Sequence, residues 1–249
     1  CPLPLPGGDT LAEANGCFFA LFPKKAGREF EINTPEDLVR VGSLIARIHL
    51  VGQERTPRDR IVLSPQGSTL SDLDFLITGG FITPEHLPVF RDLTFRIVES
   101  ISGLFDGIGL IRIHGDCHRG NLLDRPGEGL MAIDFDDMML GPPMQDLWML
   151  LPDHASRSKR EIDLLLEGYE RFREFNYASL RLIEPLRFMR IIYYLAWCAR
   201  QYDDNDFRVN HPDWGSETFW QREISDLNHQ FQVIMEHKVA WEEGRFFGE

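Results

Sequence analysis

The sequence lacks the features that mark a membrane or exported protein. It contains no apolar run of about 18 residues, the length that predicts a membrane-spanning helix. Its first residues, CPLPLPGGDT, lack the basic stretch and apolar core of a secretory signal. No internal repeat or low-complexity segment is visible. We therefore expect a cytoplasmic globular protein without a membrane partner.

Cysteine and positive charge are both scarce. The four cysteines show no CxxC spacing, which argues against a disulfide framework or a zinc site and favours reduced thiols. Lys and Arg number 26 against 39 Asp and Glu, so the formal net charge is −13. Nucleic acids reward basic patches, so this balance disfavours a nucleic-acid partner. It does not identify a substrate.

The 249 residues, 43% of them hydrophobic, suffice for a packed core. The apolar run 17–22 predicts a buried strand, and Thr34 followed by Pro35 predicts the start of a helix that ends near Gly52. A second helix is expected from Thr83 to about Leu104. Helical spacing recurs later, with Ser179 and Ser216 as candidate N-caps, over 145–152, 157–174, 179–203 and 216–240.

A short β-hairpin is expected in the middle of the chain. Residues 111–113 form an apolar edge, followed by the polar run HGDCHRGN at 114–121. Leu122 and Leu123 then predict one strand, and 130–133 the returning strand after a turn at 125–129. Such a hairpin brings the residues before its first strand close to those after its second. The overall expectation is an α+β fold, mostly helical, with one small functional hairpin.

The polar run carries a recognisable pattern of chemistry. It resembles the kinase catalytic loop H-R-D-L-x-x-x-N, with the same interval from Asp116 to Asn121. After the returning strand comes Asp134-Phe135-Asp136, the position of the kinase D-F-G. Carboxylate and amide oxygens suit Mg²⁺. We therefore expect Asp116 and Asp134 to be catalytic, with Asn121 and Asp134 on the metal.

HGDCHRGN, IDFDD and GPPMQDLWMLL together resemble the aminoglycoside phosphotransferase/choline kinase family, whose fold is protein-kinase-like. The stretch LIEPLRFMRIIYYLAWCARQ at 182–201 is similar to a bacterial serine/threonine protein kinase of that fold that acts in the stress response. The resemblance implies ATP as donor, Mg²⁺ as cofactor and a protein hydroxyl as acceptor. A monomer in the cytoplasm is also expected.

The resemblance assigns further roles to neighbouring residues. Ala20 and Phe22 would border the hinge that binds adenine, and His118 stands where protein kinases often carry a lysine facing the γ-phosphate. Three residues would support the site without reacting, namely His114, Asp136 and Asp146. For each, a packing or solvated role is the simpler alternative; Asp146, for example, also suits a helix start. Cys117 is expected to be a packed residue rather than a nucleophile.

The resemblance divides the chain into a remnant of an N-terminal lobe and hinge at 1–33 and a helical C-terminal lobe at 34–249. It implies that the N-terminal sheet is largely absent, with roughly 80–90 residues and the phosphate-binding lysine expected upstream. The expectation is therefore that this sequence is part of a longer protein. The intact mass of the natural protein would test this.

Three alternatives stay open at this point. A kinase of small hydroxylated molecules, of the aminoglycoside, choline or homoserine type, would use the same residues. A non-catalytic scaffold is a second possibility, suggested by the missing nucleotide-covering sheet. His114, Asp116 and His118 could instead hold a transition metal, although Asn121 and Asp134 favour Mg²⁺.

Overall fold

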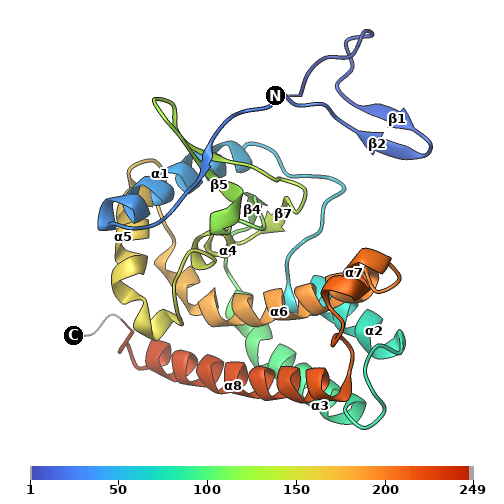
Figure 1. The fold of residues 1–249 in the computed structure, drawn as a ribbon. Helices are drawn as coiled ribbons and strands as arrows, with labels where there is room; N and C mark the ends of the chain where they lie inside the picture. The colour runs from blue at the N-terminus through green and yellow to red at the C-terminus, as the bar shows by residue number, and fades with distance from the viewer. Residues whose placement is uncertain (1, 247–249) are drawn as a thin grey trace.

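The computed structural model describes residues 2–246. Cys1 and residues 247–249 lie outside the described part. Helices make up most of the molecule, and the small sheets lie in the upper part of the view in Figure 1. The helices are α1 Pro35–Gly52, α2 Leu70–Thr78, α3 Leu87–Ser102, α4 Met144–Trp148, α5 Lys159–Glu170, α6 Ile183–Arg200, α7 Asn205–Asn210 and α8 Glu217–Glu242.

The strands are short and all pair antiparallel. They are β1 Ala12–Ala14, β2 Cys17–Phe19, β3 Arg28–Glu29, β4 Ile111–Ile113, β5 Leu122–Arg125, β6 Gly129–Ala132 and β7 Met139–Gly141. The predicted hairpin is present as β5 and β6, and β3 adds to its β5 edge. Strand β4 pairs with β7, which the sequence did not predict. The polar loop and the segment after β6 are therefore held between two small sheets.

The apolar run at 17–22 is not buried, which corrects the sequence-based expectation. Strand β2 pairs only with β1, and this ribbon extends away from the body of the molecule (Figure 1). Phe18 is 69% exposed and Phe22 is 65% exposed. A two-stranded ribbon has no second layer within residues 2–246 to cover its faces, so its apolar side chains stay in contact with solvent.

Helix α1 begins as predicted. Thr34 is its N-cap: the Thr34 hydroxyl accepts from the Asp37 N–H, while the Asp37 carboxylate accepts from the Thr34 N–H at 3.0 Å. This reciprocal capping box satisfies two backbone donors that the first turn leaves free. Asp37 also binds Arg40, and the hydrogen bonds lower the pKa of Asp37 although burial opposes them.

Helices α1 and α5 cross at two glycines. A Cβ on Gly42 would overlap the carbonyl oxygen of Leu165, and a Cβ on Gly168 would overlap that of Val39. The Ser43 hydroxyl donates to the Gly168 carbonyl across the crossing at 2.9 Å. The absence of side chains therefore lets the two backbones touch, which fixes the distance between α5 and the helix that runs behind the polar loop.

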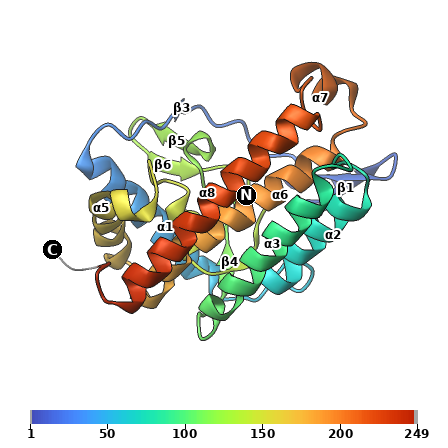
Figure 2. The ribbon, with the colours of Figure 1, turned by 90° about the horizontal axis from the view of Figure 1, so that it is seen from below.

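Seen from below, α8 runs across the front of the molecule, with α3 beside it and α6 behind it (Figure 2). Trp220 on α8 is fully buried against Phe90 on α3, and its indole N–H donates to the Phe81 carbonyl at 2.9 Å. The hydrogen bond satisfies the polar atom that burial of a tryptophan would otherwise strand. These contacts join α8 to α3, and α6, which faces the polar loop, packs against α8.

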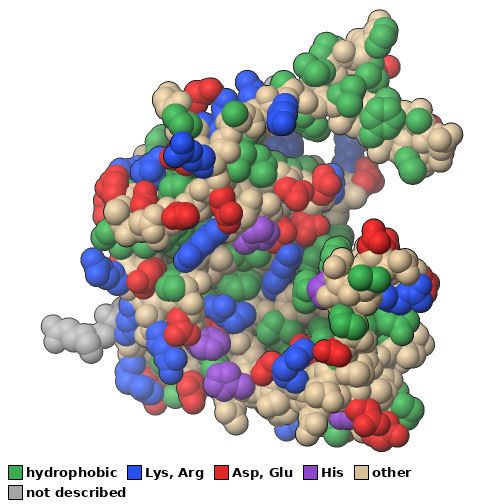
Figure 3. Space-filling model, viewed as in Figure 1, with side chains coloured by type: hydrophobic (Ala, Val, Ile, Leu, Met, Phe, Trp, Pro, Cys, Tyr) green, Lys and Arg blue, Asp and Glu red, His purple; other side chains and the backbone are tan. Residues whose placement is uncertain are grey.

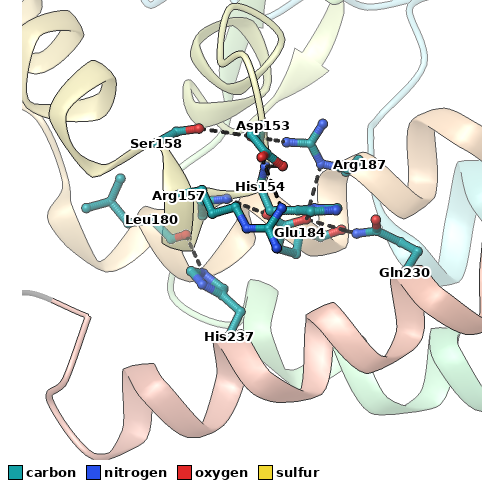
Figure 4. Close-up of polar contacts among 10 residues, drawn as sticks. Asp153, His154, Arg157, Ser158, Leu180, Glu184, Arg187, Gln230 and His237 are labelled. Carbon is teal, nitrogen blue, oxygen red and sulfur yellow. Dashed lines mark hydrogen bonds and ion pairs between the residues drawn. The ribbon is translucent and has the colours of Figure 1, made fainter.

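A buried carboxylate ties α6 to its neighbours. Glu184 is fully buried and accepts from Ala155 N at 2.7 Å, Arg187 Nε at 3.1 Å and Gln230 Nε2 at 3.0 Å (Figure 4). Burial raises the pKa of Glu184, but Arg187 and the hydrogen bonds outweigh it and leave the pKa below its usual value. The start of α6 is thereby joined both to the turn before α5 and to α8.

Several helix boundaries differ from the sequence-based expectation. Helix α3 begins at Leu87, because Thr83 to His86 form a separate hydrogen-bonded turn. Ser216 caps α8 as predicted. Ser179 is not a cap, since it is buried inside the 3₁₀ segment Tyr177–Leu182 that Asn176 caps. No helix within residues 2–246 combines the length and apolar character needed to cross a bilayer.

Candidate active site

The polar loop follows β4 directly. It continues through a 3₁₀ turn at Arg119–Asn121 into β5, so both of its ends are anchored in sheets. Gly115 has a φ of +89°, and a Cβ there would overlap the Asp137 carbonyl oxygen. The loop therefore needs glycine at this position, both for the left-handed backbone and for the close approach of the segment after β6.

Asp146, in α4, supports this loop from beneath. It is 1% exposed, and its carboxylate accepts from His114 N and Gly115 N, each at 2.8 Å. The neighbouring Gln145 donates to the Gly115 carbonyl at 3.1 Å. These are the contacts expected of the brace suggested by the sequence.

A buried chain of polar groups continues behind Asp146. His49 on α1 lies 2.8 Å from Asp146 through Nε2 and 2.9 Å from the Tyr169 hydroxyl through Nδ1. Arg173 donates to the same hydroxyl at 2.9 Å. Burial raises the pKa of Tyr169 to about 12. Helices α1, α4 and α5 thus all contribute to the position of the loop.

His114 has both ring nitrogens occupied. Nε2 lies 2.8 Å from the Ile133 carbonyl oxygen, which can only accept, so Nε2 carries the proton. Nδ1 then accepts from the Asp116 N–H at 3.3 Å. The ring is fully buried beside Phe135, with centroids 4.4 Å apart. His114 therefore connects the loop to the end of β6 and has no nitrogen left for a metal, which weakens the transition-metal alternative.

The hairpin brings Asp116 and Asp134 to one cavity. The Asn121 carbonyl oxygen accepts from the Ile133 N–H at 2.9 Å, so the residue just before β5 lies beside the residue just after β6. Asp134 follows with a φ of +61°, a left-handed conformation uncommon for a residue with a side chain. A cavity of about 360 Å³ is lined by both carboxylates and by Asp136. Figure 3 shows acidic side chains along the hollow between the projecting ribbon and α7.

Asn121 is oriented by the loop itself. Its Nδ2 donates to the Asp116 carbonyl oxygen at 2.9 Å, and the side chain is 7% exposed. With the amide nitrogen used in this way, the amide oxygen is the atom available to a cation. Asn121 and Asp134 thus offer hard oxygen ligands of the kind that Mg²⁺ takes alongside water and phosphate. Within residues 2–246 no three His, Cys, Asp or Glu side chains form a metal cage.

The other sequence-predicted residues vary in their placement. The His118 ring is half exposed, with Nε2 3.6 Å from an Asp116 carboxylate oxygen. Ala20 and Phe22 are exposed in the segment after β2 and do not line the cavity. Cys117 is fully buried, and burial raises the pKa of its thiol well above the usual value, as expected of a packed residue and not of a nucleophile.

Arg190 and Asp137 are parts of the site that sequence reasoning missed. Arg190, on α6, donates to an Asp116 carboxylate oxygen at 2.6 Å and lies 3.4 Å from Asp137. Tyr193 donates to the other Asp137 oxygen at 2.8 Å. The helical spacing of α6 gave no signal for these contacts, because they depend on how α6 packs against the loop.

The fold and this arrangement define a protein-kinase-like phosphotransferase. The family described as "Phosphotransferase enzyme family" matches residues 1–183, and the chain belongs to this family. The family resemblance inferred from the sequence is confirmed, and so is the fold class.

Similar proteins include two bacterial kinases. Stress response kinase A of Escherichia coli (strain K12) is 33% identical over 230 residues, which cover 92% of this chain and 70% of that protein. The protein of Salmonella typhimurium named serine/threonine protein kinase RdoA is 32% identical over the same shares of the two chains.

Solved structures show the same fold at low identity. The amicoumacin kinase hAmiN, in complex with AMP-PNP, Ca²⁺ and Ami, has a TM-score of 0.66 and 16% identity, over 90% of this chain and 71% of that one. The spectinomycin phosphotransferase APH(9)-Ia, in complex with ADP and spectinomycin, has a TM-score of 0.58 and 16% identity, over 95% of this chain and 76% of that one.

Proposed function

We propose that the protein transfers the γ-phosphoryl group of ATP to a hydroxyl group, with Mg²⁺ as the cofactor. The observation that carries this proposal is that Asp116 and Asp134 line one cavity at the end of the hairpin, with Asn121 hydrogen-bonded to the Asp116 carbonyl oxygen. Phosphoryl transfer asks a protein mainly for positioned oxygen ligands and a group that orients the attacking hydroxyl. The three side chains supply both.

Each of the three has a separate role in this proposal. Asn121 and Asp134 would hold the metal through oxygen atoms, and Mg²⁺ would supply positive charge to neutralise the phosphates. Asp116 orients the acceptor hydroxyl and takes its proton late in the reaction. The bond from the γ-phosphorus to the bridging oxygen breaks as the bond to the acceptor oxygen forms, and ADP leaves. The hydrogen bonds from the loop backbone to Asp146 keep Asp116 and Asn121 in fixed positions relative to each other.

The acceptor that we propose is a serine or threonine hydroxyl of a protein. The names of the kinases from Escherichia coli and Salmonella support it. The site adds a physical reason, since Arg190 already pairs with Asp116 and Asp137. Two of the acids around the cavity are thus not free to hold the ammonium group of an amino alcohol. An acceptor whose hydroxyl is not accompanied by a positive charge suits this arrangement of charges better.

A kinase of a small hydroxylated molecule is the second candidate. It is favoured by the outer wall of the cavity, where the rings of Tyr194 and Trp197 stack with centroids 6.0 Å apart and are both half exposed. A planar or cationic ligand could pack on such a wall. The similar spectinomycin phosphotransferase and amicoumacin kinase are in complex with spectinomycin and with Ami, respectively.

Transfer of radiolabelled phosphate separates the two candidates. The natural protein that contains this sequence is incubated with γ-labelled ATP, Mg²⁺ and a bacterial lysate, and the extract is divided into protein and small-molecule fractions. We expect acid-stable label on serine or threonine of proteins. Label only in a small hydroxylated molecule would support the second candidate, and no transfer by the Mg²⁺-loaded protein would support the scaffold. A role in the stress response, a cytoplasmic location and a monomeric state belong to the same proposal.

A further inference from the structure

Arg190 stands at the junction of two cavities. It lines the cavity of about 360 Å³ that holds the acidic side chains, and also a neighbouring one of about 340 Å³. Tyr193 and Trp197 are shared in the same way, and the second cavity reaches Gly115 of the polar loop. An acceptor that approaches Asp116 through the second cavity therefore passes the guanidinium of Arg190.

The guanidinium is held on more than one side. One terminal nitrogen donates to Asp116 Oδ1 at 2.6 Å, and the other lies 3.4 Å from Asp137 Oδ2. The ring of Tyr193 lies beneath it, 4.7 Å from centroid to guanidinium carbon. The Tyr193 hydroxyl in turn donates to Asp137. A planar, rigid donor fixed by two carboxylates and a ring can define the direction of the Asp116 carboxylate.

Asp116 needs such a partner because the loop fixes only its backbone. The loop contacts described above bind the Asp116 N–H and carbonyl oxygen, through His114 and Asn121. Its carboxylate is bound by Arg190 through one oxygen, while the other oxygen faces His118 at 3.6 Å. Arg190 therefore holds one oxygen of the carboxylate, and the other oxygen can accept a hydrogen bond from an incoming hydroxyl.

We propose that Arg190 is a positioning residue for phosphoryl transfer, which holds the Asp116 carboxylate in the orientation that accepts the hydroxyl. The inference rests on the proposed function and adds a residue from α6 to it. Arg190 does not belong to the nucleotide or metal ligands in this assignment. Its loss therefore lowers the rate of transfer without lowering the affinity for Mg²⁺·ATP.

The test compares variants of the natural protein that contains this sequence. We expect Arg190→Ala to lower kcat by about 100-fold, the size of loss that a misplaced reacting group produces. The dissociation constant for a Mg²⁺-loaded, non-hydrolysable ATP analogue is expected to stay within about 2-fold, since the metal ligands are untouched. Added methylguanidinium in the millimolar range should restore part of kcat in Arg190→Ala. Arg190→Lys should keep more activity than Arg190→Ala, because it retains a positively charged donor nitrogen.

Two matched variants control for the surroundings. Tyr193→Phe keeps the ring beneath the guanidinium and the pair with Asp116, so its kcat should fall by no more than about 5-fold. Arg171→Ala removes an exposed arginine on the surface next to α5, whose partner is Glu167 at 2.8 Å, and should leave kcat unchanged. A general sensitivity of the fold to loss of arginine would lower activity in Arg171→Ala as well.

The outcomes are distinct. If Arg190→Ala keeps the wild-type kcat, or if methylguanidinium gives no recovery, the positioning role is wrong. A loss of analogue affinity as large as the loss of kcat would place Arg190 on the nucleotide and also overturn it. Failure of the wild-type protein to phosphorylate any hydroxyl would instead defeat the proposed function, and with it this inference.

Discussion

Replacement of Asp146 by Asn tests how the loop is held. Asp146 accepts from two backbone N–H groups of the loop and lies against His49, all at 2.8 Å and away from solvent. An asparagine offers one oxygen in place of two. Its amide nitrogen would face a donor, either a backbone N–H of the loop or the His49 ring, and this leaves a buried donor unpaired.

The size of the effect follows from these contacts. A hydrogen bond to a charged group contributes about 1.5–3 kcal/mol, and an unpaired buried donor adds a desolvation cost. We therefore expect Asp146→Asn to lower the free energy of unfolding by about 3 kcal/mol. For a chain of this length that corresponds to a fall in Tm of about 10 °C. Transfer activity should fall as well, because the backbone of Asp116 and Asn121 loses its support.

Urea unfolding followed by circular dichroism measures the first effect, and phosphate transfer below the new transition measures the second. Asp92→Asn is a matched control, because Asp92 has a 71% exposed side chain and its Arg91 partner lies 3.6 Å away. It should change stability by less than about 0.5 kcal/mol. If Asp146→Asn unfolds at the same urea concentration as Asp92→Asn, the brace contributes no measurable stability and this reasoning is refuted.

Further predictions concern the reacting groups, the helix crossing and pH. Asp116→Asn should remove nearly all turnover and leave the Mg²⁺·nucleotide affinity, measured by isothermal titration, unchanged. Asp134→Ala should weaken that affinity about 10-fold or more. Equal losses of affinity in both variants would contradict the assigned roles. Gly168→Ala should lower the free energy of unfolding by about 3 kcal/mol in urea, because the new methyl group meets the Val39 carbonyl. The control Gly103→Ala has open space around the new methyl group and should change that free energy by less than about 1 kcal/mol. Similar urea midpoints for the two variants would refute the close crossing. Burial lowers the pKa of His237 below its usual 6.5, so the unfolded chain takes up a proton first and stability should fall as the pH drops below 6.5 toward the folded pKa. His237→Gln, measured by urea unfolding between about pH 7 and 5, should show a smaller fall, and an identical pH slope would count against a neutral buried ring.

Local sequence was enough to predict that Asp116 and Asp134 would lie close together. The residues from Asp116 to Asp134 span a single hairpin, so the turn between its strands brings its two ends together without reference to the rest of the chain. The same holds for α1 and α8, whose N-caps at Thr34 and Ser216 are local hydrogen bonds. Periodicity therefore located most helices, although α7 and the true start of α3 were missed.

The surroundings of that centre were decided by tertiary packing. His49 meets Asp146 across 97 residues of sequence, and Arg190 meets Asp116 across 74. Which turn of a helix faces the loop depends on how the helices cross, as at Gly42 and Gly168, and no short pattern encodes that. Burial of 17–19 also required a second layer, which an apolar composition alone cannot supply. The sequence thus determined which polar groups the hairpin brings together, and the packing of α1 and α6 determined what holds them.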